Sequence, residues 1–242
     1  MARLRPVWIP AATLVALLPV LAGLGVWQLQ RAEQKQVLQQ EYDQRAHEVP
    51  QPIGAELQSA AALRFRHVAA RGRYDPDYQV LVDNRVHQGV AGYHVVTPLK
   101  LEGSDTRVLV NRGWIPLGTS REQLPSIETP VGVTEPVGVV TLPAEEIFTL
   151  GGPTPREQGW QPVWSHLDMK RYAAAVPFPV QPVVLLLDAN ERHGFIRAWP
   201  RPDARMAMHQ GYAFMWFALA GLVAVIFVLT MRRKRRRQKR TA

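Results

Sequence analysis

The longest uncharged and largely apolar stretch of the chain covers residues 206–231. It contains no Asp, Glu, Lys or Arg. Its core, residues 212–231, has about the 20 residues that a helix needs to cross roughly 30 Å of hydrocarbon. The pattern predicts a transmembrane helix over residues 212–231.

One face of this helix combines a histidine with aromatic and small side chains. Positions three, four and seven residues apart return to the same side of a helix. This spacing places five residues on one face: His209, Tyr212, Ala213, Trp216 and Ala220. An ionisable side chain at the edge of a membrane span is a candidate functional residue. The alternative is an ordinary interfacial residue beside Tyr212 and Trp216.

A second apolar stretch lies near the start of the chain, where residues 7–29 carry no charged side chain. Trp8 and Trp27 are 19 residues apart, or roughly 28 Å along a helix, as expected for the two aromatic belts of one bilayer. We therefore predict a first transmembrane helix over residues 7–29. A cleaved signal peptide is the alternative, but its apolar core would be too long and no clear A-x-A site follows. Pro19 predicts a kink or a helix contact.

Residues 30–48 are polar, free of Gly and Pro, and rich in helix formers. They predict that the first helix continues into water until Pro50 and Pro52 end it. Gln28, Arg31 and Lys35 are expected to share one side of this helix. Their side chains would either snorkel to lipid phosphates or hold an anionic ligand beside the membrane.

From Leu63 onward the pattern changes to short segments rich in Val, Tyr and Phe, separated by Gly, Pro, Asp and Asn. One helix is predicted over residues 167–176, with Asp168 as N-cap and Pro177 as stop. A tight turn is expected at residues 102–105, an irregular excursion at 117–134 and a loop at 151–155. We predict an antiparallel β-rich domain with one or two helices. The expected strands are 65–74, 79–86, 93–101, 106–115, 136–143 and 180–188.

The charge distribution indicates an orientation. The net charge is +9, but the excess lies at the ends, with Arg3 and Arg5 in front and eight Lys or Arg residues in 232–242. Basic flanks stay on the cytoplasmic side of a membrane. The eight basic residues after the second predicted span outnumber the three before it, Arg197, Arg201 and Arg205. The basic tail could also bind anionic lipid. We expect residues 1–6 and 232–242 to be cytoplasmic and residues 30–211 to be periplasmic.

The expected fold class is therefore a membrane protein of the α+β type. Two transmembrane helices, at the N- and C-terminal ends, flank an antiparallel β-rich extracytoplasmic domain. The expected location is the cell inner (plasma) membrane, with a multi-pass topology. The chain has no cysteine, which rules out disulfides, thiolate metal sites and a Cys nucleophile.

Common enzyme motifs are absent from the sequence. There is no G-x-S-x-G, G-x-x-x-x-G-K-[ST], H-E-x-x-H or CxxC pattern. Ser165 and His166 are adjacent, but neighbours on a helix or strand point apart, so the pair is weak support for a nucleophile and base. His67 and His94 are expected to be half-buried strand residues. The other histidines, His47, His87, His166 and His193, are expected to be exposed. We therefore expect no catalytic residues and no enzyme activity.

Several short motifs, in this order, resemble the surfeit locus protein 1 family. They begin with Gly25-x-Trp27-Gln28-Leu29-x-Arg31 and Lys35, and continue with Gly72-x-Tyr74 and Gly92-Tyr93 with Thr97-Pro98-Leu99. Next comes Val110-Asn111-Arg112-Gly113-Trp114-Ile115-Pro116, and the last motif is His209-x-x-Tyr212-Ala213-x-x-Trp216-Phe217-x-x-Ala220. The match spans nearly the whole chain with the same two-span topology. Phe214-Met215 departs from the family, in which these positions are usually polar or small.

Proteins of that family are cytochrome c oxidase assembly factors. The resemblance implies a factor that helps place haem a in the catalytic subunit of the terminal oxidase, with that subunit and other assembly factors as partners. It implies a haem contact, either stable or transient, at His209 as a possible iron ligand, with Tyr212 and Trp216 beside the macrocycle. Arg31 and Lys35 are expected to pair with the propionates. The lipid bilayer is a partner in this interpretation, and nucleic acid is not.

Two other hypotheses belong to different functional classes. The first is a membrane-anchored protein-interaction module that makes no haem contact. The second is a membrane-tethered hydrolase, which requires a Ser or Thr, a His and a carboxylate clustered on the β domain. Trp114 and Arg112 are expected to form a contact with a partner. The alternative is that Trp114 belongs to the core.

Overall fold

The computed structural model describes residues 8–118, 123–143, 160–200 and 206–241. Backbone contacts divide the chain into two units, residues 1–40 with 201–242, and residues 41–200. Residues 1–6, the predicted loop 151–155, Arg201 and Arg205 lie outside the described residues. Each unit is described by itself.

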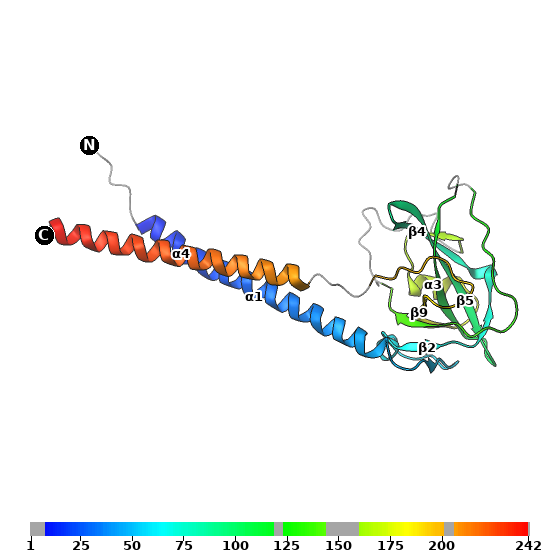
Figure 1. The fold of residues 1–242 in the computed structure, drawn as a ribbon. Helices are drawn as coiled ribbons and strands as arrows, with labels where there is room; N and C mark the ends of the chain where they lie inside the picture. The colour runs from blue at the N-terminus through cyan, green and yellow to red at the C-terminus, as the bar shows by residue number, and fades with distance from the viewer. Residues whose placement is uncertain (1–7, 119–122, 144–159, 201–205, 242) are drawn as a thin grey trace. The chain divides into compact units, whose positions relative to one another are not determined.

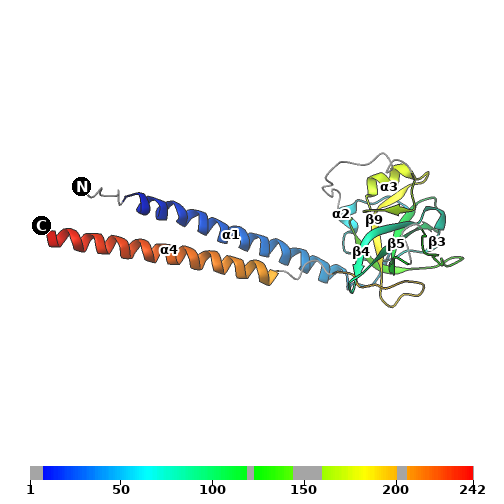
Figure 2. The same ribbon diagram turned by 90° about the horizontal axis from the view of Figure 1, so that it is seen from above.

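The first unit is a pair of long helices, α1 (Trp8–Arg45, of which residues 8–40 belong to the pair) and α4 (Met206–Thr241). In Figures 1 and 2 the first turns of α1 lie beside the last turns of α4, so the helices run antiparallel. By length and composition, residues 12–45 and 206–233 are both able to cross a membrane. The predicted aqueous extension of the first helix is confirmed as helix as far as Arg45, and α4 continues through the basic tail.

A seven-residue repeat marks the side on which these two helices meet. The less exposed residues follow alternate steps of three and four, which is the spacing of a helix–helix seam. On α1 they include Leu14, Leu18, Leu21, Gly25, Gln28, Ala32, Lys35 and Gln39. On α4 they include Met206, His209, Ala213, Trp216, Ala220, Val223 and Phe227. Two residues of the first resemblance motif, Gly25 and Gln28, and four of the last, His209, Ala213, Trp216 and Ala220, therefore lie along the contact between the helices.

The second unit is built on a nine-stranded sheet. The strand order is β1 (Gln51–Pro52), β2 (His67–Ala69), β7 (Val137–Thr141), β9 (Val180–Leu187), β6 (Arg107–Pro116), β5 (Val90–Leu101), β4 (Val80–His87) and β8 (Val163–Trp164), and β3 (Gly72–Tyr74) pairs with β5. Three short helical segments accompany it: α2 (Ala60–Leu63), η1 (Pro76–Tyr78) and α3 (Met169–Ala175).

The sheet is mixed, so the prediction of a purely antiparallel sheet was wrong. The pairs β1–β2, β4–β8 and β6–β9 are parallel. Two parallel strands need a long crossover connection, because the chain must return to the end of the sheet at which the first strand began. The chain between β6 and β9 is long enough for such a crossover, whereas a tight turn is not. The antiparallel expectation came from the short turns, such as the one after β5, where it holds.

Most predicted strands are confirmed within a few residues, with one exception. Residues 65–74 do not form a single strand, because the chain leaves the sheet after β2 and returns as β3 beside another strand. The two-residue strands β1 and β8 are too short to give a periodic pattern. The predicted helix is confirmed as α3, with the Asp168 carboxylate accepting from the N–H groups of Lys170 and Arg171 at 2.8 and 3.1 Å.

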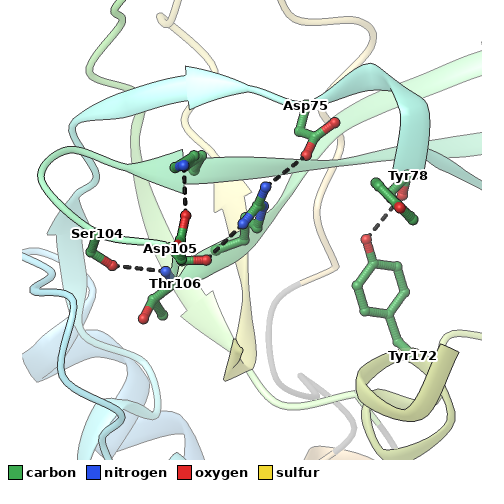
Figure 3. A network of polar contacts seen from close by, with 8 residues as sticks. Asp75, Tyr78, Ser104, Asp105, Thr106 and Tyr172 are labelled. Atoms are coloured by element: carbon green, nitrogen blue, oxygen red, sulfur yellow. Dashed lines mark hydrogen bonds and ion pairs between the residues drawn. The ribbon is translucent and has the colours of Figure 1, made fainter. Parts of the chain in front are cut away.

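The sheet has apolar clusters on both faces. Alternate residues of β9 separate accordingly, since Val183 and Leu185 join one cluster and Val184 the other. The second cluster includes Tyr172 of α3, whose hydroxyl donates to the carbonyl of Tyr78 at 2.9 Å (Figure 3). Near it, Asp75 and Arg107 form an ion pair of 3.2 Å. The Tyr172–Tyr78 bond ties α3 to η1.

Candidate functional site

A hydrogen bond joins the two helices at the most distinctive polar pair of the first unit. Nδ1 of His209 lies 2.8 Å from the amide oxygen of Gln28. A carbonyl oxygen only accepts, so Nδ1 carries the hydrogen and donates it. In the neutral ring, Nε2 then keeps its lone pair. Metal-binding histidines commonly show this arrangement, with one nitrogen tied to an acceptor and the other free to bind.

Small residues let the helices approach closely around this bond. Ala213, one turn after His209, is only 1% exposed. A Cβ added at Gly25 would lie 2.7 Å from ring atoms of Phe217, so glycine is what makes room for that ring. One contact therefore explains two motif positions from opposite ends of the chain, Gly25 and Phe217.

The other predicted residues of this unit lie at different places around the helices. Trp216 is half-buried in the seam, whereas Tyr212 is 45% exposed and lies outside it. Trp27 is 48% exposed, with the Arg31 guanidinium 5.8 Å from the centre of its ring. Arg31 also donates to Gln34 at 3.1 Å. The predicted shared side of Gln28, Arg31 and Lys35 is thus only partly right, because Arg31 is exposed beside the seam.

In the β domain, Arg112 is a buried internal clamp. Its side chain is 1% exposed and donates to the carbonyls of Glu128 and His193 at 2.7 and 3.0 Å and to the Thr129 hydroxyl at 3.2 Å. Burial lowers the pKa of Arg112. The guanidinium also lies 5.3 Å from the ring centre of Tyr74, and burial raises the pKa of that phenol to about 12. Arg112 therefore holds two loops against β6, with the Tyr74 ring beside its guanidinium.

Gly113 and Trp114 have structural roles in the same strand. Gly113 adopts a φ of +126°, and an added Cβ would lie 2.8 Å from the carbonyl carbon of Phe195. This space admits the 195–196 segment, which bonds to Trp114 through N–H···O contacts of 2.7 and 3.1 Å. Trp114 is 6% exposed and donates to the Arg85 carbonyl at 2.8 Å. Of the two interpretations of Trp114, the core position is confirmed.

Asn111 connects β6 to a histidine on β5. Its Oδ1 accepts from the N–H of Gly113 at 3.2 Å, and its Nδ2 lies 3.4 Å from Nδ1 of His94. His94 is half-buried, as expected for a strand histidine. Burial, with the nearby charge of Arg85, lowers its pKa to about 4, so this imidazole is neutral at physiological pH.

The hydrolase hypothesis finds little support among the described residues. The Ser165 hydroxyl and Nδ1 of His166 lie 3.1 Å apart, because the two residues lie in a bend rather than on a regular element, which the sequence did not reveal. Within the described part of the chain, no carboxylate bonds to His166, so the base lacks the third group of a triad. The described residues also contain no group of three or more His, Asp or Glu that could hold a metal ion.

The sequence did not predict two side-chain contacts, Gln28 with His209 and Asn111 with His94. Gln28 was identified as a motif residue, but not as the partner of His209. The signal that could have found it is the seven-residue repeat running through Gln28 in one helix and His209 in the other. For His94 and Asn111 no such signal exists, because a register shift between Val95 and Val96 sets their alignment.

Comparisons with known proteins agree with these motifs. The model of the SURF1 family matches residues 15–221. The chain is similar to Surfeit locus protein 1 of Mus musculus, at 25% identity over 230 residues that cover 83% of this chain and 72% of the relative. It is also similar to the SURF1-like protein of Caenorhabditis elegans, at 27% identity over 261 residues covering 93% and 75%. The SURF1-like protein of Drosophila melanogaster is 27% identical over 222 residues, covering 85% and 72%.

Proposed function

Because the chain belongs to the SURF1 family, we propose that it is an assembly factor for a haem–copper terminal oxidase. Its partners would be the catalytic subunit and other assembly factors, and its cargo would be haem a. In this role the protein acts by binding and positioning rather than by turning over a substrate.

The observation that carries this proposal is the Gln28–His209 hydrogen bond. It supports a haem contact because Nδ1 is tied to Gln28, so the Nε2 lone pair of His209 would be free to bind the iron of a haem. An imidazole nitrogen is an ordinary protein ligand of haem iron, so His209 would fit such a contact. Haem a would supply the ligand-accepting iron.

The remaining residues of the unit would surround the cargo. Trp216 and Tyr212 offer ring faces to a flat macrocycle, one from within the helix seam and one from beside it. Arg31, exposed next to Trp27, would pair with a propionate. Lys35 lies along the seam on the same side as Gln28 and would serve the same purpose.

We further propose that the two helices anchor the protein in the cell inner membrane, with both ends cytoplasmic and the β domain outside. The length and apolar character of both helices support this arrangement. The basic tail supports the orientation.

The competing proposal is an interaction module in which the same bond only joins helices. Polar side chains commonly hydrogen-bond across membrane helices without binding a ligand. In that case His209→Ala would loosen the helix pair and leave haem a loading unchanged.

The decisive experiment uses a strain that makes an aa3-type oxidase and lacks this gene, complemented with wild type, His209→Ala or Met208→Ala. Met208 is the matched control, since it is the exposed neighbour. We expect His209→Ala to lose most terminal oxidase activity and haem a content, and Met208→Ala to retain both. Normal haem a content with His209→Ala would favour the interaction module. An unchanged oxidase in the deletion strain would overturn the assembly role.

A further inference from the structure

The β domain contains a cavity that no part of the proposed function uses. Its volume is about 330 Å³, within the range of small-molecule sites, at the small end. We call it the His94 pocket. It lies over four neighbouring strands, where the register pairs Val82 with His94, Val96 with Asn111, and Asn111 with Leu186. All the described residues that line it belong to the 41–200 unit.

The hydrogen-bond chain on the pocket floor determines what His94 can offer. The Gly113 N–H fixes the Asn111 oxygen at 3.2 Å, so the amide nitrogen is the group that faces Nδ1 of His94 at 3.4 Å. Nδ1 is therefore the acceptor. The ring hydrogen must then be on Nε2, which makes His94 a neutral donor. The Trp199 ring packs edge-on against it, with centroids 5.4 Å apart.

Arg85 adds a positive charge to the same lining. Its buried Nε–H has no hydrogen-bond partner among the described residues. An unsatisfied buried donor costs free energy unless a ligand or water accepts from it. None of the described lining residues is acidic. The polar lining therefore includes a neutral donor, His94, and a cation, Arg85, which together complement a small anion.

The rest of the lining is apolar. It includes Leu142, Pro143, Leu167, Leu186 and Trp199. A hydrated inorganic anion has no apolar surface that could pack against these side chains. A ligand with an anionic head and a short hydrocarbon chain matches both parts of the pocket.

We propose that the His94 pocket binds a small organic carboxylate with an apolar chain, whose oxygens accept from Nε2 of His94 and from the guanidinium of Arg85. The chain of the ligand packs against Leu167, Leu186 and Trp199. This site is independent of the proposed haem contact, because the two share no residue.

The test is an isothermal titration of the full-length protein in zwitterionic nanodiscs with hexanoate, corrected with empty nanodiscs. Hexanamide, which has the same chain without the charge, and acetate, which has the charge without the chain, are titrated in parallel. We expect saturable 1:1 binding of hexanoate, with at least tenfold weaker binding of both other probes. Equal binding of hexanoate and hexanamide, or no saturable binding of hexanoate, overturns the proposal.

Protein variants then locate the site. Arg85→Gln should weaken hexanoate binding at least tenfold, while the matched control Arg73→Gln, on the exposed side of β3, should bind as wild type does. Arg85→Lys keeps the charge but lacks the Nε donor, so intermediate affinity is expected. Wild-type affinity in Arg85→Gln, confirmed as folded by circular dichroism, overturns the assignment. The probe comparison on wild type tests the charge requirement even if a variant fails to fold.

Discussion

In the helix pair and in the β domain, an amide side chain forms a hydrogen bond with Nδ1 of a histidine, but the direction of the hydrogen bond is opposite in the two regions. On the helices, the Gln28 carbonyl oxygen accepts from Nδ1 of His209. On the sheet, the Asn111 amide nitrogen donates to Nδ1 of His94. The first ring is left with a lone pair on Nε2 and the second with a hydrogen there. One histidine is suited to bind a metal and the other to bind an anion.

The difference follows from what fixes each amide. Asn111 is oriented by the backbone N–H of Gly113, inside a strand whose own hydrogen bonds are set by the sheet. Gln28 is positioned by helix packing through small residues such as Ala213 and Gly25. The β-domain tautomer should therefore depend on backbone geometry, and the helix tautomer on a single side chain.

The largest effect is expected from Gly113→Ala, which strains the backbone segment whose N–H orients Asn111 beside the β-domain histidine. The added Cβ meets backbone atoms of Phe195 at 2.8 Å, at a φ of +126°. Backbone cannot move aside as a side chain can, so we expect a loss of about 3 kcal/mol or more in the free energy of unfolding. Chemical denaturation of the purified protein measures it. Gly54→Ala, which meets nothing within 4 Å, is the control, and equal losses in the two variants would refute the strain argument.

The next effect concerns the helix histidine. Gln28→Leu leaves His209 without its acceptor, so neither its tautomer nor its orientation is fixed. Removing such a supporting partner typically costs 10–100-fold in metal affinity. Absorbance titration of the purified protein with haem measures the change. Gln30→Leu, at an exposed position of the same helix, should bind as wild type does, and wild-type haem affinity in Gln28→Leu would refute a positioning role.

A smaller effect is expected from pH. The pKa of folded His94 is about 4, below its usual value of about 6.5 in an unfolded chain. As the pH falls from about 6.5 to 4, the unfolded chain takes up a proton that the folded domain does not, so stability decreases over this range. Because the ring is partly exposed, we expect a contribution on the order of 1–2 kcal/mol.

His94→Gln should remove this part of the pH dependence, as measured by unfolding at several pH values. His47→Gln, at an exposed histidine, should keep it. Identical pH profiles for wild type and His94→Gln would contradict the neutral buried state.

The smallest effect is expected from Gly25→Ala. Its Cβ would meet the Phe217 ring at 2.7 Å, which is as close as the contact at Gly113 but involves a side chain that can rotate. Overpacking costs about 1–3 kcal/mol, but Ala is about 1 kcal/mol more favourable than Gly inside a helix. We therefore expect a net loss below about 1 kcal/mol. The thermal unfolding midpoint of the helix pair in detergent measures it. A loss as large as that of Gly113→Ala would mean that the seam is as rigid as the sheet.

Much of this arrangement could be read from the sequence, and the failures have physical reasons. Periodicity correctly put His209, Ala213, Trp216 and Ala220 on one face, because each lies within a few tens of degrees of the seam. A three-residue step turns a helix by about 300°, leaving an offset of about 60°. That offset carries Tyr212 and Arg31 out of the seam.

The β domain was less readable beyond its strand positions. The parallel pairing of β6 with β9 and the approach of Asn111 to His94 are both long-range alignments, accompanied by register shifts. A one-residue slip exchanges the two faces of a strand. The alternation of residues within each strand therefore could not show that His94, Arg85 and Trp199 line one cavity.

The most direct test of the opposed histidines is nitrogen NMR of the full-length protein labelled with ¹⁵N-histidine at neutral pH. His209→Gln and His94→Gln serve to assign the two signals. We expect His209 to be protonated on Nδ1 and His94 on Nε2, and Gln28→Leu to change only the His209 signal. The same tautomer at both positions, or a His209 signal unaffected by Gln28→Leu, would contradict the proposed role of the Gln28–His209 pair.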